Sequence, residues 1–330
     1  AYDGGMLSRV RSNPLRLLLL PFFLVAQAVA VVRLQREYGF VAVHAHWIIP
    51  QGLVTAILSV LWRGLPPLLV TSHGGDLYAL RGSLLRGLKR WILSRADAVT
   101  VVSAAMRDHC EEHRLAPGRT IVQSMGVDLQ GQFTPGDPAS SRDGLVFVGR
   151  LVEKKGVEYL IEAMSILSAD YSQLQLTIVG DGPLRKSLVE LAAARGVSDR
   201  VRFVGSVVNE EVPGYLRTAA ISVMPSVVAA SGDQEGLGLV AVEAQGCGCA
   251  VVASDLPAVR DAVIDGQTGL MARPGDATDL ADKIRALLDD DSLRRSLAQE
   301  GRRQAIEKFD WSKVGASYAR IIGDLLNAAR

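Results

Sequence analysis

The chain has 330 residues, of which 48% are hydrophobic and 22% are charged, and its formal net charge is +1. This length allows two domains of ordinary size, and the composition is typical of globular proteins. The near-neutral charge argues against nucleic acid as the main partner, because that interaction usually needs a strongly basic face. The three cysteines lack the spacing of a disulfide framework, which indicates reduced thiols and a cytoplasmic compartment.

The chain begins with AYDGGMLSRVRSNP, which contains no strand pattern, and continues into the apolar residues 17–32. That run is shorter than the about 20 residues needed to span a bilayer, and it contains Pro21 and Gln27. Arg11 and Arg16 precede the run, so a signal peptide is an alternative, but no good small-residue cleavage site is evident. We expect a buried or interfacial helix of the first domain.

Short β-rich runs alternate with longer amphipathic runs from residue 41 onward. Such alternation predicts a parallel sheet that is covered by helices on both faces. The strands expected here are residues 41–44, 68–71, 98–101 and 120–122, and the helices are residues 52–62, 83–94 and 104–113.

Residues 133–143 are rich in Pro, Gly, Ser and Asp, and they are predicted to link two domains. The alternation then restarts, which predicts a second parallel sheet. The strands expected in this part are residues 145–148, 175–179, 201–204, 221–224 and 250–253, and the helices are residues 157–167, 184–195, 210–218, 239–246, 276–289, 293–308 and 311–329.

Residues 232–250, GDQEGLGLVAVEAQGCGCA, hold two carboxylates eight positions apart, Glu235 and Glu243. Gly238 opens the predicted helix that contains Glu243. A helix N-terminus offers unpaired N–H groups to a phosphate, and each carboxylate can accept hydrogen bonds from vicinal hydroxyls. The pattern therefore suits a nucleotide-diphosphate sugar. Two glutamates at this spacing also occur by chance on the solvated faces of many helices.

The same stretch resembles the signature of retaining GT-B glycosyltransferases of family 4, which carry an E-x7-E motif in this setting. The resemblance extends from about residue 41 to the C-terminus. Further motifs stand at matching places, namely HAHW (44–47), SHGGD (72–76), VVS (101–103), MGVD (125–128), VGRLVEKKG (148–156), VGDGPL (179–184) and FVGSV (203–207).

The resemblance implies an α/β fold with two Rossmann-like, doubly wound domains that face each other across a cleft. It implies an acceptor-side domain over residues 1–135, a donor domain over residues 136–310 and a helix over residues 311–330 that packs back on the first domain. Family members begin with a strand and a Gly-rich loop that are missing here, so we expect the first domain to be N-terminally truncated.

The leaving diphosphate gains negative charge as the glycosidic bond breaks, and a cation must meet that charge. By resemblance, Arg150 and Lys155 bind the donor diphosphate, Glu235 contacts the transferred sugar and Glu243 binds the ribose hydroxyls. Arg150 follows an expected strand at its carboxyl end, where ligands bind in open α/β sheets. Surface cations on a solvated loop are the structural alternative.

Backbone groups complete the donor site that the resemblance implies. Gly238, Leu239 and Val240 offer N–H groups to the phosphate, and the main chain near Val207 holds the nucleotide base. Gly180 to Pro183 follow a strand and either line the donor site or form a simple turn.

His73 follows an expected strand, and the resemblance places it against the donor sugar near the reacting carbon. Asp76 either orients His73 or caps the next helix. His44 and His46 are expected to pack and to hydrogen-bond to a neighbouring loop. The catalytic residues are therefore predicted to be His73, Arg150, Lys155 and Glu235.

The resemblance implies retention of anomeric configuration through front-face transfer, with a double displacement through a carboxylate such as Glu235 as the alternative. No Asp-x-Asp motif ends a strand, and the acidic residues 289–291 are expected to be solvated, so we expect metal-independent catalysis without a cofactor. The donor is expected to be a UDP- or GDP-linked sugar, and the acceptor a saccharide or lipid-linked molecule in polysaccharide or glycolipid synthesis.

Residues 81–95, RGSLLRGLKRWILSR, interleave basic with apolar side chains. Such a helix can rest on an anionic membrane surface at the inner face of the cell membrane, or it can be an ordinary helix with a core stripe and a solvated basic face. No nucleic acid is expected as a partner.

Other function classes compete with the glycosyltransferase interpretation. A catalytically impaired nucleotide-sugar-binding remnant would bind the donor without transfer. A GT-B epimerase or phosphorylase is a further enzyme class. A nicotinamide oxidoreductase receives little support, because no GxGxxG follows a strand.

Overall fold

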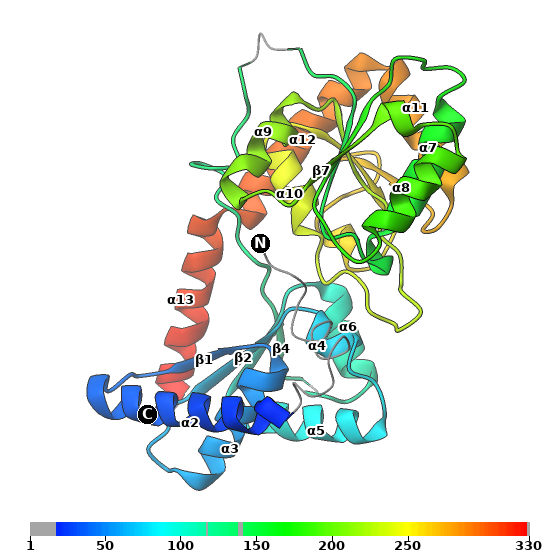
Figure 1. The fold of residues 1–330 in the computed structure, drawn as a ribbon. Coiled ribbons are helices and arrows are strands. Elements are labelled where there is room, and N and C mark those ends of the chain that lie inside the picture. The colour runs from blue at the N-terminus through cyan, green and yellow to red at the C-terminus, as the bar shows by residue number, and fades with distance from the viewer. Residues whose placement is uncertain (1–17, 117, 138–140, 329–330) are drawn as a thin grey trace. The chain divides into compact units, whose positions relative to one another are not determined.

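The computed structural model of the chain describes residues 18–116, 118–137 and 141–328 (Figure 1). These residues form two compact units, each built on its own parallel sheet. The N-terminal unit contains residues 18–124 and 315–328, and the C-terminal unit contains residues 125–314. The opening residues 1–17, including Arg11 and Arg16, lie outside the described part of the chain.

The N-terminal unit holds a four-stranded parallel sheet in the order β1-β2-β3-β4. All five residues of β2 are buried, as expected for a parallel strand that is covered on both faces. The strands are β1 (Val43–His46), β2 (Leu68–Ser72), β3 (Ala98–Val101) and β4 (Thr120–Val122). The helices before and between them are α2 (Leu20–Tyr38), the π-helical turn η2 (Ile48–Gly52), α3 (Leu53–Leu61), α4 (Gly75–Tyr78), α5 (Ser83–Ser94) and α6 (Ala104–Glu112).

The C-terminal helix α13 (Trp311–Ala328) packs on the sheet of the N-terminal unit. Ile321 and Leu325 are buried against Leu69 of β2. Asp310 precedes the helix, and its carboxylate accepts a hydrogen bond of 2.9 Å from the backbone N–H of Ser312, which satisfies one of the unpaired groups at the helix N-terminus.

The C-terminal unit holds a six-stranded parallel sheet in the order β10-β9-β8-β5-β6-β7. One cluster of its core contains Phe147 of β5, alternate residues of the other strands and the inward faces of helices that cover the sheet. The strands are β5 (Leu145–Val148), β6 (Leu176–Val179), β7 (Val201–Gly205), β8 (Ile221–Met224), β9 (Ala250–Ser254) and β10 (Leu270–Ala272). The helices are α7 (Val157–Leu167), α8 (Arg185–Ala194), α9 (Val212–Thr218), α10 (Leu239–Gly246), α11 (Ala277–Asp289) and α12 (Asp291–Phe309), and the short 3-10 turns are η3 (Glu153–Lys155), η4 (Ser198–Arg200), η5 (Asn209–Glu211) and η6 (Val259–Asp261).

The order of this sheet reverses between β5 and β8. The chain proceeds from β5 to β6 and β7 on one side, and then returns to place β8, β9 and β10 on the other side. The loops that leave the carboxyl ends of β5 and β8 therefore turn in opposite directions. In open α/β sheets, ligands bind in the crevice that forms at such a switch point.

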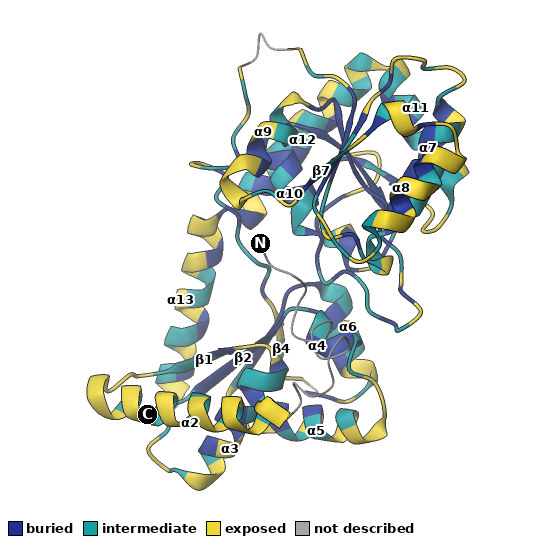
Figure 2. Cartoon of the chain, viewed as in Figure 1, coloured by how far each residue is buried: buried dark blue, intermediate teal, exposed yellow. Residues whose placement is uncertain are grey.

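Two parallel sheets, each covered by helices, confirm the α/β fold class that the alternating pattern predicts. Figure 2 shows buried strands in both units under helices whose outer faces are exposed. The unit boundary lies at Met125 rather than at residue 136, because Leu129 and Phe133 are buried in the C-terminal unit. Atoms of Leu129 and Phe133 lie so close to Gly246 that a Cβ atom on Gly246 would collide with them. The predicted linker includes residues 138–140, which lie outside the described part.

The prediction that the apolar run forms a helix is confirmed by α2. Burial of this helix is not observed, because none of the residues of α2 is buried. Phe22, Val25 and Val29 are among its exposed side chains. None of the described helices has the length and hydropathy that crossing a membrane requires.

Candidate functional site

The loop after β5 brings Lys155 to the loop after β8. Residues Glu153–Lys155 form the 3-10 turn η3, which ends at Gly156. Gly156 has a left-handed φ of 59°, and a Cβ atom there would stand 2.0 Å from the carbonyl oxygen of Pro225. Only glycine allows this close approach of the two loops.

Lys155 forms a partly buried ion pair with Glu235, with 2.8 Å between Nζ and Oε1. The Glu235 side chain is 10% exposed and that of Lys155 is 15% exposed. Ser226 follows Pro225 in the loop after β8. Its hydroxyl lies 3.4 Å from the same carboxylate oxygen of Glu235. Burial favours the neutral carboxyl, but the Lys155 and Lys154 ammonium groups and these hydrogen bonds outweigh it, so the pKa of Glu235 lies below its usual value.

The two residues before Lys155 also bind the loop after β8. The Lys154 ammonium lies 3.1 Å from Oδ1 of Asp233. The Glu153 carboxylate accepts a hydrogen bond of 2.6 Å from the backbone N–H of Ala230. Three consecutive side chains of η3 therefore hold one loop, which fixes the position of Glu235 before α10 begins.

Helix α10 begins directly after this loop, with Gly238 as its N-cap in a left-handed conformation (φ 88°, ψ 49°). The first-turn N–H groups of Leu239 and Val240 have no partner within the helix. Glu243 lies about one turn further along and is half-buried. Burial raises the pKa of Glu243 to about 7, although the Lys155 charge opposes the shift. The structure thus brings Lys155, Glu235 and the start of α10 together.

Arg150 follows β5 at the same edge of the sheet and is exposed. It forms no ion pair with any residue that the structure describes. The turn after β6 lies beside it, because the backbone N–H of Leu151 donates to the carbonyl oxygen of Asp181 at 3.0 Å. Val207 is half-buried and follows β7, two strands from β5, which corresponds to about 10 Å across the sheet.

His73 lies in the N-terminal unit, directly after β2, and contacts the last residue of β1 and the residue that follows it. Its Nε2 atom shares a hydrogen bond of 2.9 Å with Nδ1 of His46. The ring of Trp47 lies 5.6 Å from the His73 ring, between centroids. Burial, together with the neighbouring His46, lowers the pKa of His73 to about 4. The imidazole of His73 is therefore neutral near pH 7.

Asp76 is buried beneath this histidine and binds the backbone around it. Its carboxylate accepts hydrogen bonds from the N–H of Ile48 at 2.6 Å, the hydroxyl of Ser72 at 2.8 Å and the N–H of His73 at 3.2 Å. Asp76 therefore positions His73 through its backbone, while His46 contacts its ring. His44 hydrogen-bonds instead to the hydroxyl of Thr71 at 2.7 Å.

Asp289 and Asp290 are exposed, as expected, and all three acidic residues 289–291 also have partners. Asp289 accepts a hydrogen bond from the Tyr171 hydroxyl, Asp290 caps α12 by accepting from the N–H of Leu293 at 2.8 Å, and Asp291 pairs with two arginines of the same helix. Each of the three acidic side chains therefore has a partner within the C-terminal unit.

Sequence reasoning did not identify the partners that fix the site. Lys154, Asp233 and Ser226 hold the loop around Glu235. The sequence signal that could have indicated these partners is the pair of consecutive lysines, Lys154 and Lys155. The contact of His46 with His73, by contrast, is the hydrogen bond to a neighbouring loop that is expected for His46.

Two family profiles match the chain. The profile described as glycosyl transferases group 1 matches residues 136–304, and the profile of glycosyltransferase family 4 matches residues 3–130. The first contains the β5 and β8 loops and α10, and the second contains His73.

Similar proteins from other organisms align with most of the chain. An uncharacterized glycosyltransferase of Methanocaldococcus jannaschii is 29% identical over 87% of this chain and 76% of its own length. A glycogen synthase of Mycobacterium tuberculosis is 30% identical over 76% of this chain and 59% of its own length. A GDP-mannose-dependent alpha-(1-6)-phosphatidylinositol monomannoside mannosyltransferase of Mycolicibacterium smegmatis is 30% identical over 81% of this chain and 73% of its own length.

Among solved structures, the chain is similar to a sucrose-phosphate synthase from Thermosynechococcus elongatus. The TM-score is 0.79 at 28% identity, with 91% of this chain and 77% of the other chain covered.

The ion pair between Lys155 and Glu235 predicts a large loss of stability in Lys155→Met. The substitution leaves a buried carboxylate without its main cation, and breaking such a pair costs about 3–5 kcal/mol. We expect faster amide hydrogen exchange in β5 and β8, measured by mass spectrometry, and partial recovery in Lys155→Met/Glu235→Leu.

Lys186→Met is the matched control, because Lys186 and Glu190 are both exposed and lie 3.9 Å apart. Surface pairs of this kind contribute little. Equal exchange rates in Lys155→Met and Lys186→Met would contradict a structural role for the Lys155 pair.

The raised pKa of Glu243 predicts a pH dependence of stability. The folded chain holds this proton up to about pH 7, whereas the unfolded chain releases it near 4.5. Stability from this group is therefore complete below the unfolded value, and about 3 kcal/mol at most is lost as pH rises through the folded value. Glu243→Gln should remove this loss in denaturation series from pH 5 to 8.

The exposed Glu190→Gln is the control and should leave the pH profile unchanged. Parallel profiles for wild type and Glu243→Gln would show that the Glu243 carboxyl is ionised in the folded protein at pH 5.

Proposed function

The chain belongs to the group 1, family 4 glycosyltransferases, and we propose that it transfers a sugar from a nucleotide-diphosphate sugar to an acceptor hydroxyl with retention of configuration. One observation carries this proposal. At the switch point of the C-terminal sheet, Lys155 pairs with Glu235 directly before α10, whose second carboxylate is Glu243. A cation, a helix N-terminus and two carboxylates there match the parts of such a donor.

The donor diphosphate binds the cations and the start of α10. Arg150 has no carboxylate partner among the described residues and can grip phosphate oxygens with two parallel hydrogen bonds. Lys155 adds a point charge, and the N–H groups of Leu239 and Val240 add the positive end of the helix. This positive field stabilises the diphosphate as it leaves, which is the largest contribution that the site can make to the transition state.

The two carboxylates bind the two sugars of the donor. Glu243 accepts hydrogen bonds from the ribose hydroxyls, and Glu235, held by Lys155 and Ser226, contacts the transferred sugar. The main chain near Val207 holds the base, and about 10 Å across two strands is a suitable spacing between base and diphosphate. The donor is a UDP- or GDP-linked sugar.

Transfer proceeds on the front face of the sugar. The acceptor hydroxyl attacks from the side of the leaving group, and the departing phosphate takes the proton of that hydroxyl. The salt bridge supports this route over double displacement, because a carboxylate paired at 2.8 Å with Lys155 is a weakened nucleophile.

His73 contacts the donor sugar as a neutral imidazole. Arg150, Lys155 and the helix N-terminus supply the positive charge, so catalysis needs neither a metal ion nor a cofactor.

The acceptor is a saccharide or a lipid-linked molecule used in cell-envelope polysaccharide or glycolipid synthesis. The mannosyltransferase of Mycolicibacterium smegmatis, whose name specifies a phosphatidylinositol monomannoside, is 30% identical to this chain. Helix α5 supports contact with the inner face of the cell membrane, because Leu84, Arg86 and Arg90 are all exposed along it.

Thermal unfolding in the presence of UDP-, GDP- and ADP-sugars tests donor binding, since a ligand that binds only the folded state raises the melting temperature. We expect a rise with one UDP- or GDP-sugar that is reduced in Glu243→Ala.

Turnover should fall by about a hundredfold or more in Arg150→Ala, by analogy with losing one preorganised donor to a developing anion. NMR of the product should show the anomeric configuration of the donor, with unchanged rates in EDTA.

Arg195→Ala is the control, because Arg195 is exposed on another face and pairs with Glu162 at 2.8 Å. Equal turnover in Arg150→Ala and Arg195→Ala would exclude the assigned role of Arg150. Donor binding without transfer to any acceptor would favour a nucleotide-sugar-binding remnant.

A further inference from the structure

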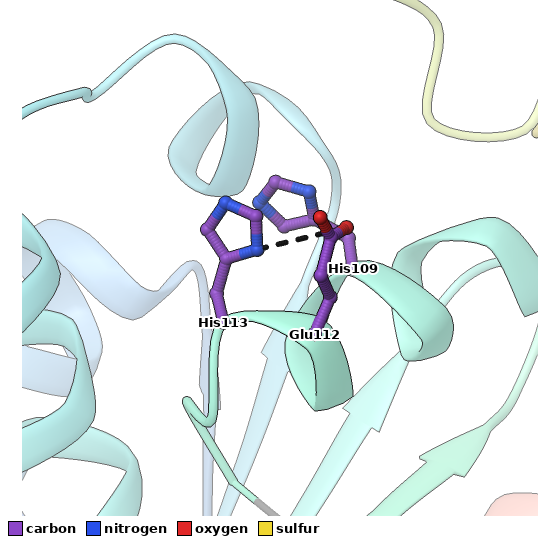
Figure 3. Close-up of side chains that lie close together, drawn as sticks. All are labelled: His109, Glu112 and His113. Atoms are coloured by element: carbon purple, nitrogen blue, oxygen red, sulfur yellow. Dashed lines mark ion pairs between the residues drawn. The ribbon is translucent and has the colours of Figure 1, made fainter.

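The last turn of α6 carries three side chains that could bind a metal ion. His109 and Glu112 belong to α6, and His113 is its C-cap residue. A ring nitrogen from each histidine and a carboxylate oxygen of Glu112 all lie within 4.8 Å of one another. The spacing of four residues places both rings on one helix face, where they stack with 4.2 Å between centroids (Figure 3).

One of these atoms has an unmet bonding requirement. Nδ1 of His113 is buried and has no hydrogen-bond partner. Oε2 of Glu112 lies 3.8 Å from this nitrogen, which is too long for a hydrogen bond. Buried polar atoms without partners are rare and destabilising. An ion bound between the two groups would satisfy both.

Charge around the three residues is mixed. The C-terminal end of a helix carries negative partial charge, and the Glu112 carboxylate adds a full charge, which both favour a cation. Arg81, Arg86 and Lys89 line the same cavity of about 280 Å³ as the two histidines and oppose it. Lys89 is partly screened, because its ammonium donates to the carbonyl oxygens of Leu77 and Leu80 at 2.7 and 2.9 Å. These cations limit the affinity.

We propose that His109, Glu112 and His113 bind one divalent transition-metal ion of the Zn²⁺ or Co²⁺ class. Two imidazoles and one carboxylate suit Zn²⁺, Co²⁺, Ni²⁺ and Cu²⁺, whereas Mg²⁺ and Ca²⁺ prefer oxygen ligands. Water fills the remaining position, which opens on the cavity that both histidines line. This site lies in the N-terminal unit and shares no residue with the proposed donor-binding site of the C-terminal unit.

Titration of the full chain, with any affinity tag removed, tests the site. Co²⁺ should bind in one equivalent and give a visible absorption band, and Zn²⁺ should displace it, while millimolar Mg²⁺ should not. His109→Ala and His113→Ala should each weaken Co²⁺ binding by at least tenfold, because even residues that only support metal ligands contribute 10–100-fold. Glu112→Gln should weaken it less.

Glu111→Gln is the matched control, because Glu111 is an exposed neighbour of Glu112 that is not part of the cluster. Circular dichroism of each variant establishes that α6 is folded. Co²⁺ affinity that is unchanged in His109→Ala and His113→Ala, or that is lost in His73→Ala instead, would overturn the proposal. Stabilisation by inorganic phosphate but not by Zn²⁺ or Co²⁺ would assign the cavity to anions and would also overturn it.

Discussion

The ion pair between Lys155 and Glu235 is the constraint on which the C-terminal unit depends. It joins the loop after β5 to the loop after β8, the two loops that diverge where the strand order reverses. A charged pair with so little exposure is stable only with short geometry and further hydrogen bonds. Ser226 supplies one such bond, and Gly156 allows the approach of the backbones that places the pair. The start of α10 follows from this junction.

The same constraint bears on the proposed binding of a diphosphate. Lys155 is paired with Glu235, while Arg150 at the same sheet edge has no carboxylate partner among the described residues. Glu243 is held with a pKa raised by burial to about 7, so its carboxyl can both donate and accept hydrogen bonds near neutral pH. Under the proposed function, Lys155 contributes positive charge to the diphosphate while it continues to hold Glu235 in position.

Much of this arrangement could be predicted from the sequence because local signals agree with the fold. Gly238 and the apolar run after it fix the bounds of α10, which the sequence predicts at residues 239–246 as observed. Other features depend on contacts that no local pattern contains. The apolar run in α2 looks the same whether a partner covers it or not, and its residues are not buried. A linker-like composition near residue 136 does not reveal that Phe133 packs in the core.

We propose, above all, that the junction of the β5 and β8 loops binds the donor diphosphate. Hydrogen–deuterium exchange with and without the nucleotide sugar that most stabilises the protein tests it directly. We predict slower exchange in peptides covering residues 149–156 and 226–243, with no change in β10 at the far edge of the same sheet. Stabilisation by the nucleotide sugar without protection of either loop would contradict the claim.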